Sequence, residues 1–210
     1  MTDLRTRFAE DCRRQSWLPL LLEAYERSDA AVARAVARAE AGGRRLACRR
    51  GCSACCASHA DIPVYPLELV GLSWYATEQV AGRTREALKA QLRADRKEGP
   101  CPFLVDDACA VHPLRPMACR HFNVLDRPCA PGEDAYHSRR GDVVAPPAAE
   151  RDAALAVTLP FYGVAPGAEG RLLREGALDA VARNLHDCHW SSLAERMDAY
   201  DRNEAARPAR

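Results

Sequence analysis

Four cysteines lie within nine residues near the end of the first quarter of the chain: Cys48, Cys52, Cys55 and Cys56. Thiolates bind soft or borderline cations such as zinc and iron, and a short loop can wrap several sulfurs around one centre. Gly51 precedes Cys52 and suits a tight loop, because glycine adopts left-handed backbone conformations without strain. This density of thiols predicts a metal-binding loop in preference to disulfides or buried packing cysteines.

A second group of four cysteines follows, so that eight clustered thiols are the expected metal ligands: Cys48, Cys52, Cys55, Cys56, Cys101, Cys109, Cys119 and Cys129. Eight thiols suffice for two four-sulfur sites, or for one site with spare thiols. Neighbouring side chains diverge in extended backbone, so Cys55 and Cys56 can serve two centres or chelate one through a distorted turn. Structural zinc usually takes separated Cys-x-x-Cys pairs. The tighter clustering slightly favours an iron–sulfur cluster over zinc as cofactor, although neither bacterial nor plant ferredoxin spacing is matched.

The order of these residues resembles the YkgJ-like cysteine-cluster family (CxxCxxCC), which is described as a zinc- or iron-chelating domain. The resemblance covers roughly residues 48–129 and includes the run Cys109-Ala-Val-His-Pro-Leu-Arg-Pro-Met-Ala-Cys119-Arg-His-Phe. This chain has three residues between Cys48 and Cys52 where the family has two, and His112 stands where the family commonly has an aromatic residue. Members with a similar cysteine pattern include a flagellin lysine methylase. The resemblance therefore implies metal binding, with an iron–sulfur enzyme as one alternative.

Several other side chains could contribute to such a site. A neutral imidazole is a good ligand for zinc or iron, and the alternative for each histidine is a solvated or supporting role. The candidates are His59, His112, His121, His186 and His189. Arg115 and Arg120 could place positive charge near the thiolates. Cys12 and Cys188 lie in expected helical segments and are interpreted as small buried hydrophobes, although Cys188 with His186 and His189 could form a second ligand set or a catalytic patch.

Charge and motifs narrow the range of partners. The chain has 30 basic and 29 acidic residues, a formal net charge of +1, so no global field attracts nucleic acid or an anionic membrane. No phosphate loop, nucleophile elbow or dinucleotide fingerprint is present. We expect the metal ion or cluster as the main partner, with a protein partner or substrate recognised locally. No hydrophobic signal segment follows Met1, and the apolar stretch 17–22 is too short to span a bilayer, so a cytoplasmic location is expected.

Helices must position these thiols. Apolar residues at helical spacing predict one or two helices over residues 16–40, ending at Gly42 and Gly43 and leading directly into the cysteine loop. Pro66 suits the first turn of a helix over 66–75, and a second helix is expected over 83–97. The segment 99–131 contains six prolines, which indicates loops and short helical turns rather than sheet.

The C-terminal third is expected to begin with a polar surface excursion over 132–147. Helical patterns then predict helices over 148–159 and 171–185, and a last helix beginning near Ser191, capped by Ser191 or Ser192. The tail 203–210 is expected to fray.

These elements predict a mainly α fold in which helices brace irregular cysteine-rich metal-binding loops. One compact domain would contain an N-terminal helical brace (1–47), a cysteine-cluster core (48–131) with a helical spacer at about 66–97, and a C-terminal helical extension (132–210). Three functions fit. The first is a metal-binding cysteine-cluster protein, and the second is an iron–sulfur enzyme that modifies a protein or peptide, methylase-like. The third is a thiol-based redox or metal sensor, which Arg49 and Arg50 would favour by lowering the pKa of a nearby thiol.

Overall fold

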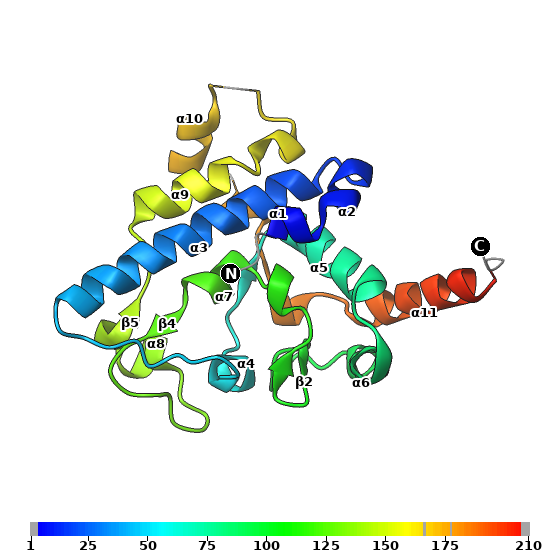
Figure 1. Cartoon of the computed structure of the whole chain (residues 1–210), viewed down its shortest axis with the longest axis horizontal. Helices are drawn as coiled ribbons and strands as arrows, with labels where there is room; N and C mark the ends of the chain where they lie inside the picture. Colours follow the sequence, from blue (N-terminus) through cyan, green and yellow to red (C-terminus); the bar gives the residue numbers. More distant parts are fainter. Residues whose placement is uncertain (1–3, 166, 177, 207–210) are drawn as a thin grey trace.

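The computed structural model describes residues 4–165, 167–176 and 178–206, and within these ranges helices dominate (Figure 1). The α-helices are α1 (Leu4–Arg7), α2 (Ala9–Arg14), α3 (Leu18–Ala41), α4 (Ala54–Ser58), α5 (Pro66–Glu78), α6 (Gly82–Arg93), α7 (Met117–His121), α8 (Ala135–Ser138), α9 (Ala148–Ala156), α10 (Glu169–Arg174) and α11 (Ser191–Ala205). Single 3-10 turns are η1 (His112–Leu114), η2 (Arg140–Asp142), η3 (Leu159–Tyr162), η4 (Asp179–Val181) and η5 (Leu185–Asp187). The expectation of a mainly α fold is confirmed. Among the described residues, none of the helices combines the length and apolarity needed to cross a membrane.

The long helix α3 organises the molecule. It runs across the structure in Figure 1 and packs against α9, α7 and α5. Leu18, Leu21, Leu22 and Tyr25 on its inner face are fully buried, as the apolar spacing predicted. The helix ends where the glycine pair was expected to stop it: the amide of Gly42 donates to the carbonyl of Ala39.

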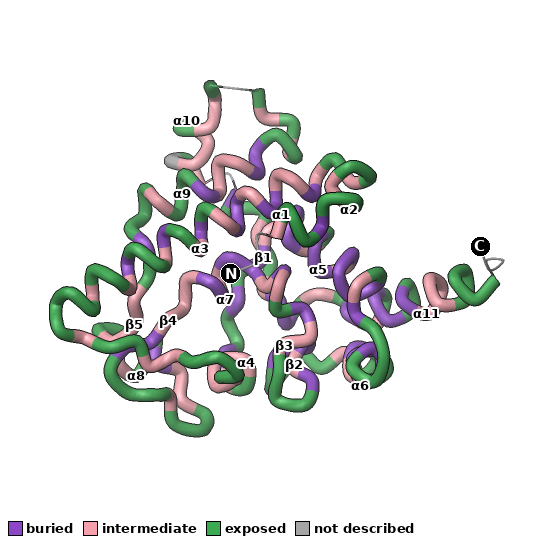
Figure 2. Tube along the Cα trace, viewed as in Figure 1, coloured by how far each residue is buried: buried purple, intermediate pink, exposed green. Residues whose placement is uncertain are grey.

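A second layer is formed by α5, α6 and α11, which pack together on the other side of the core. Pro66 occupies the first turn of α5, and the amide of the N-cap residue Tyr65 donates to Oε2 of Glu68 at 3.0 Å. Gly71 allows α5 to approach α3 closely, because a Cβ at this position would lie 2.3 Å from Cδ2 of Leu21. The buried residues in Figure 2 follow these contact faces, whereas the segment around α4 is intermediate or exposed.

The structure has three short antiparallel pairs, of which the first joins segments far apart in the sequence and the second is a local hairpin: β1 (Pro63–Val64) with β6 (Arg183–Asn184), β2 (Leu104–Val105) with β3 (Ala108–Cys109), and β4 (Asn123–Val124) with β5 (Val143–Val144). The expectation that 99–131 contains no sheet is therefore wrong. Asp106 and Asp107 both have positive φ, +47° and +57°, and so form the two-residue turn of a hairpin. Aspartate tolerates this conformation, because its short side chain can hydrogen-bond locally.

The C-terminal third departs from its predicted helices. The helix expected over 171–185 is interrupted: α10 ends at Arg174, Gly176 has φ +66°, and a 3-10 turn and strand β6 follow. The predicted serine cap of the last helix is also wrong. Trp190 is the N-cap residue, and its side chain makes no hydrogen bond to the first turn of α11. The hydroxyl of Ser192 donates to the carbonyl of His189. Helix α11 continues to Ala205, past the expected start of fraying, and the last four residues of the predicted tail, 207–210, lie outside the described residues.

Candidate metal centre

The first cysteine group begins beside strand β4. Leu46 forms an antiparallel bridge with Leu125, and the amide of Ala47 donates to the carbonyl of Val124 at 2.8 Å. The amide of Val124 in turn donates to Sγ of Cys48 at 3.2 Å. The backbone of β4 therefore fixes the position of the first thiol.

A tight turn and a short helix carry the next three cysteines. Gly51 has φ +82°, as predicted for a wrapping loop, and the amide of Cys52 donates to the carbonyl of Arg49 at 3.0 Å. Cys55 and Cys56 lie within α4, where consecutive side chains diverge by about 100° around the axis. The pair is helical rather than extended, so its two side chains diverge for a different reason from the one that the sequence suggested.

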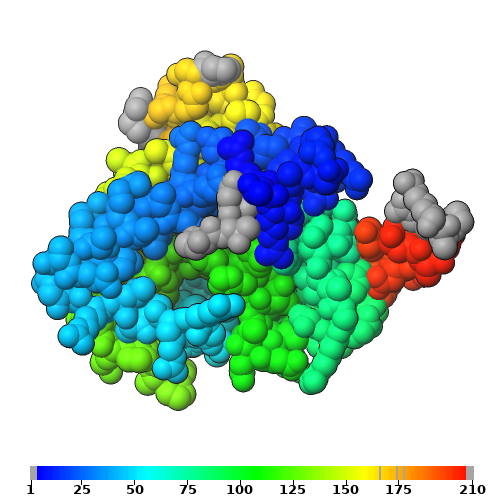
Figure 3. Space-filling model, in the orientation of Figure 1, coloured from blue at the N-terminus to red at the C-terminus, as the bar shows by residue number. Residues whose placement is uncertain are grey.

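The second cysteine group is attached to the first through the backbone. The amide of Cys101 donates to the carbonyl of Cys56 at 2.7 Å, and the amide of Leu104 donates to the carbonyl of Cys101 at 2.9 Å. The β2–β3 hairpin then places Cys109 opposite Leu104. In Figure 3 this segment, drawn in green, fills the space between the cysteine loop in cyan and the α5–α6 region in blue-green.

A buried carboxylate positions the helix that carries Cys119. Glu68 is completely buried, and its Oε1 accepts a hydrogen bond from the amide of Met117, the first residue of α7, at 2.7 Å. Burial raises the pKa of Glu68, whereas the hydrogen bonds from the Tyr65 and Met117 amides lower it. One side chain thus links the N-terminal ends of α5 and α7.

Four thiols influence one another electrostatically and are named here the inner thiol group: Cys55, Cys101, Cys109 and Cys119. The pKa of Cys101 is raised to about 12, chiefly by burial, and negative charge on Cys109 and Cys55 contributes to this rise. Burial likewise raises the pKa of Cys119, with Cys101, Cys55 and Cys109 adding to the effect. The pKa of Cys55 is raised first by its hydrogen bond with Cys56 and then by burial. Thiols from α4, the hairpin and α7 therefore share one neighbourhood.

Three further thiols form an outer thiol group: Cys48, Cys52 and Cys129. Burial raises the pKa of Cys48, and negative charge on Cys52 and Cys55 adds to the rise. Burial also raises the pKa of Cys129, with smaller contributions from Cys48 and Cys52. The influence of Cys55 on Cys48 makes Cys55 the link between the outer and inner groups.

Positive charge faces the inner group. Charge on Arg115 lowers the pKa of Cys109, which burial otherwise raises. The side chain of Arg120 is only 1% exposed, and its Nη1 donates to Asp29 at 2.7 Å while Nε donates to the carbonyl of Arg115 at 3.0 Å. Its guanidinium also lies 3.9 Å from the ring centroid of Tyr25. Arg120 thus braces the backbone of the segment that carries Cys109 and Cys119.

Sequence reasoning missed the cation beside the outer group. Nη2 of Arg139 lies 3.8 Å from Sγ of Cys129, and the guanidinium is held by Glu133 at 2.8 Å and Asp142 at 3.1 Å. Hydrogen bonding to Arg139 lowers the pKa of Glu133 to about 2. The only sequence signal was the mixture of charges in the segment 132–147, which was interpreted as a surface excursion.

The five candidate histidines have polar neighbours other than thiols. His112 faces Arg115 at 3.5 Å, and Nε2 of His121 lies 3.3 Å from the Ser28 hydroxyl on α3. Nε2 of His186 contacts the carbonyl of His59 at 3.2 Å. His59 and His189 lie near Asp134 and Asp95, at 3.3 and 3.9 Å. These contacts favour supporting roles for the histidines.

The run 186–190 does not form one ligand set, because its side chains have separate partners. His186 is buried, His189 is exposed, and Sγ of Cys188 donates to the carbonyl of Asn184 at 3.5 Å. Cys12 and Cys188 both pack against the hydrophobic core. All ten cysteines are free thiols. Within the described ranges, no three His, Cys, Asp or Glu side chains already stand in metal-coordinating geometry. The thiols are gathered, but they do not form a closed coordination shell.

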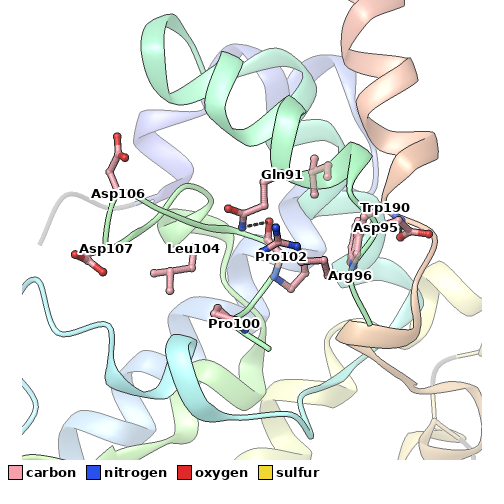
Figure 4. Close-up of a pocket in the computed structure, with 10 residues that line it drawn as sticks. Gln91, Asp95, Arg96, Pro100, Pro102, Leu104, Asp106, Asp107 and Trp190 are labelled. Carbon is pink, nitrogen blue, oxygen red and sulfur yellow. Dashed lines mark hydrogen bonds between the residues drawn. The ribbon is translucent and has the colours of Figure 1, made fainter. Parts of the chain in front are cut away.

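A hollow of about 310 Å³ lies beside the inner group, between the end of α6, the hairpin and Trp190 (Figure 4). Nε2 of Gln91 donates to the carbonyls of Pro102 at 2.9 Å and Cys101 at 3.2 Å. Asp106 and Asp107 lie at the other side of the hollow in Figure 4. Gln91 thus holds the backbone of Cys101 from the side of α6, and the hollow itself is lined by neither thiol nor histidine.

Comparison with known proteins gives one match. Residues 47–140 match the family model CxxCxxCC, whose description is "Putative zinc- or iron-chelating domain". The matched segment contains all eight clustered cysteines and reaches Arg139. No curated protein and no solved structure matches the chain. The match confirms the family resemblance found in the cysteine pattern.

Proposed function

Since residues 47–140 form a CxxCxxCC domain, a family described as zinc- or iron-chelating, we propose that the eight clustered cysteines of this chain hold iron or zinc as thiolates. The observation that carries the proposal is the convergence of thiols from separate elements. Cys55 on α4, Cys101 and Cys109 around the hairpin, and Cys119 on α7 affect one another's pKa although they are far apart in sequence. The donor set is all sulfur, which suits zinc or an iron–sulfur cluster.

We infer that the thiols serve two centres. The inner group supplies four sulfurs, the number that a closed tetrahedral zinc site or an iron–sulfur cluster takes. The outer group supplies three, so that a metal there would keep one position for another ligand. Cys56, the eighth thiol, neighbours Cys55 on α4 and packs against the core, so we assign it to the inner centre as a fifth sulfur. The dense thiol spacing slightly favours iron.

Arginines near each group support this assignment. A metal held by several thiolates carries net negative charge, which neighbouring cations stabilise. Arg115 acts on the inner group and Arg139 on the outer group. Each arginine is itself oriented: Nη1 of Arg115 donates to the carbonyl of His112 at 3.2 Å, and Glu133 and Asp142 hold Arg139.

The test is anaerobic purification followed by visible absorption and assays for iron, zinc and acid-labile sulfide. Cys119→Ser should empty the inner centre, and Cys129→Ser should empty the outer one. Cys188→Ser is the matched control, because serine can keep the hydrogen bond to Asn184 and the residue lies outside the family segment. Unchanged metal content in both Cys119→Ser and Cys129→Ser would refute the proposal. Metal loss in only one of them would refute the division into two centres.

A second candidate function is an iron–sulfur enzyme that modifies a protein or peptide. It is favoured by the three-thiol outer group and by a large cleft on α7, the helix that carries Cys119. An added small ligand such as azide should then change the absorption spectrum of the loaded protein, and Cys129→Ser should abolish the change. The third candidate, a thiol-based sensor, is supported by the exposed Cys52. Free thiols throughout the chain support a cytoplasmic location.

A further inference from the structure

A cleft of about 590 Å³ lies between parts of the chain that are distant in sequence. Its lining comes from residues 59–65, α7, the segment 134–145, α9, and the later residues Leu173, Gly176, Leu178 and Asp179. Pockets of roughly 300–1,000 Å³ are typical of small-molecule sites. The proposed metal centres do not account for this cleft, since no cysteine lines it.

The cleft is acidic in a chain that is nearly neutral. Its lining contains four carboxylates and one cationic side chain, Arg151, which leaves a formal charge of −3 when histidines are neutral: the acids are Asp61, Asp134, Asp152 and Asp179. Asp179 accepts a hydrogen bond from the Tyr65 hydroxyl at 3.2 Å, and Asp134 caps α8 through the amide of Tyr136. Asp152 has no hydrogen bond or ion pair with the described residues. One carboxylate is therefore free to pair with a ligand.

Apart from three histidines, His59, His121 and His137, apolar and aromatic side chains form the rest of the walls. Leu155 and Leu178 supply aliphatic surface, and Tyr65 and Tyr136 supply rings. The guanidinium of Arg140 already lies 4.1 Å from the ring centroid of Tyr136, so the rim holds one cation over an aromatic face. Walls of this kind match a ligand that alternates methylene chains with positive charges.

An unsatisfied nitrogen in the lining points to a hydrogen-bond donor as ligand. His59 is only 9% exposed, its ring packs edge-on against Phe122 at 4.3 Å, and its Nε2 is buried without a hydrogen-bond partner. Oδ1 of Asp134 lies 3.3 Å away, outside hydrogen-bonding alignment. Burial lowers the pKa of His59, and a neutral imidazole accepts one hydrogen bond. An N–H group of a ligand could donate to this nitrogen or to Asp134.

We propose that the cleft binds an aliphatic polyamine, with one ammonium group at His59 and Asp134, another at Asp152, and the methylene chain against Leu155 and Leu178. A lysine side chain has the same chemistry but only one charge, whereas this cleft holds several carboxylates. The free polyamine is therefore the better match to its lining.

Titration calorimetry of the full-length, metal-loaded protein with spermidine tests the proposal. We expect saturable binding of one spermidine per chain and no heat with 1,8-octanediol, an uncharged chain of similar length. Asp152→Asn should weaken binding about tenfold or more, because the charge-assisted hydrogen bond between the ammonium group and the carboxylate is lost. Ala145→Trp should block the cleft from an exposed lining position without changing the charge.

Glu195→Gln is the matched control, since it makes the same charge change on an exposed position of α11 outside the cleft. Equal weakening by Glu195→Gln and Asp152→Asn would indicate general surface attraction and overturn the proposal, as would normal binding by Ala145→Trp. Tighter binding of a lysine-containing peptide than of spermidine would overturn the choice of polyamine. Metal content and circular dichroism of each variant show that it is folded and loaded, so failure here leaves the proposed metal centres unaffected.

Discussion

Replacing Arg120 with methionine should be strongly destabilising, because this side chain is almost completely enclosed. It would lose the 2.7 Å ion pair with Asp29, the hydrogen bonds to the carbonyls of Arg115 and Pro113, and the contact with the Tyr25 ring. Breaking a buried pair by removing one partner costs about 3–5 kcal/mol. The carboxylate of Asp29 is 20% exposed, so water can reach it and the lower half of that range applies. We expect a loss of about 3–4 kcal/mol from the free energy of unfolding.

Urea unfolding at pH 7, followed by far-UV circular dichroism, measures this loss. Arg38→Met is the control, since the Arg38 side chain is 55% exposed and pairs with Glu150 only at 3.5 Å, so its loss should cost about 1 kcal/mol or less. The double variant Arg120→Met with Asp29→Asn should recover part of the loss, with a coupling energy of about 1–3 kcal/mol. The reasoning fails if Arg120→Met costs less than about 1 kcal/mol, or if its effect and that of Asp29→Asn simply add.

Two smaller perturbations test other parts of the structure. Burial lowers the pKa of His121 to about 4 from an ordinary value of 6.5, so between these values the unfolded chain binds a proton that the folded chain does not, and stability falls as the pH decreases from 6.5 to 4. His121→Asn can keep a hydrogen bond to Ser28, and its urea midpoint should fall less between pH 6.5 and 4 than that of the unmodified protein. Parallel pH profiles for the two proteins would contradict the lowered pKa of His121. Gly71→Ala should cost about 1 kcal/mol net, since overpacking against Leu21 outweighs the gain in helix propensity. Gly141→Ala has open space around the new Cβ and should be neutral within about 0.5 kcal/mol, so equal Tm shifts for the two glycine variants would refute the packing argument.

Features decided by local chemistry could be predicted from the sequence. The end of α3 at Gly42, the turn at Gly51 and the start of α5 at Pro66 each follow from the conformational range of a single residue type. The candidate ligands were likewise chosen by residue type and spacing, and their role as ligands stays a prediction.

Features decided by distant residues could not be predicted. The pairing of β1 with β6 joins strands of only two residues each, which leave no periodicity to detect. Division of the thiols into inner and outer groups depends on which elements meet, and spacing along the chain does not contain that information. Arg139 reaches Cys129 only because Glu133 and Asp142 hold its side chain.

The pairing of β1 with β6 also means that the fold cannot be completed until the C-terminal part of the chain has been translated. All eight clustered cysteines leave the ribosome before β6 and α11 have been translated, although β1 pairs with β6 and α5 packs against α11. At ordinary translation rates this interval lasts on the order of seconds. The thiol-bearing segment therefore spends that interval without its final neighbours. The cysteines are more accessible from solution during that interval than after the chain has closed.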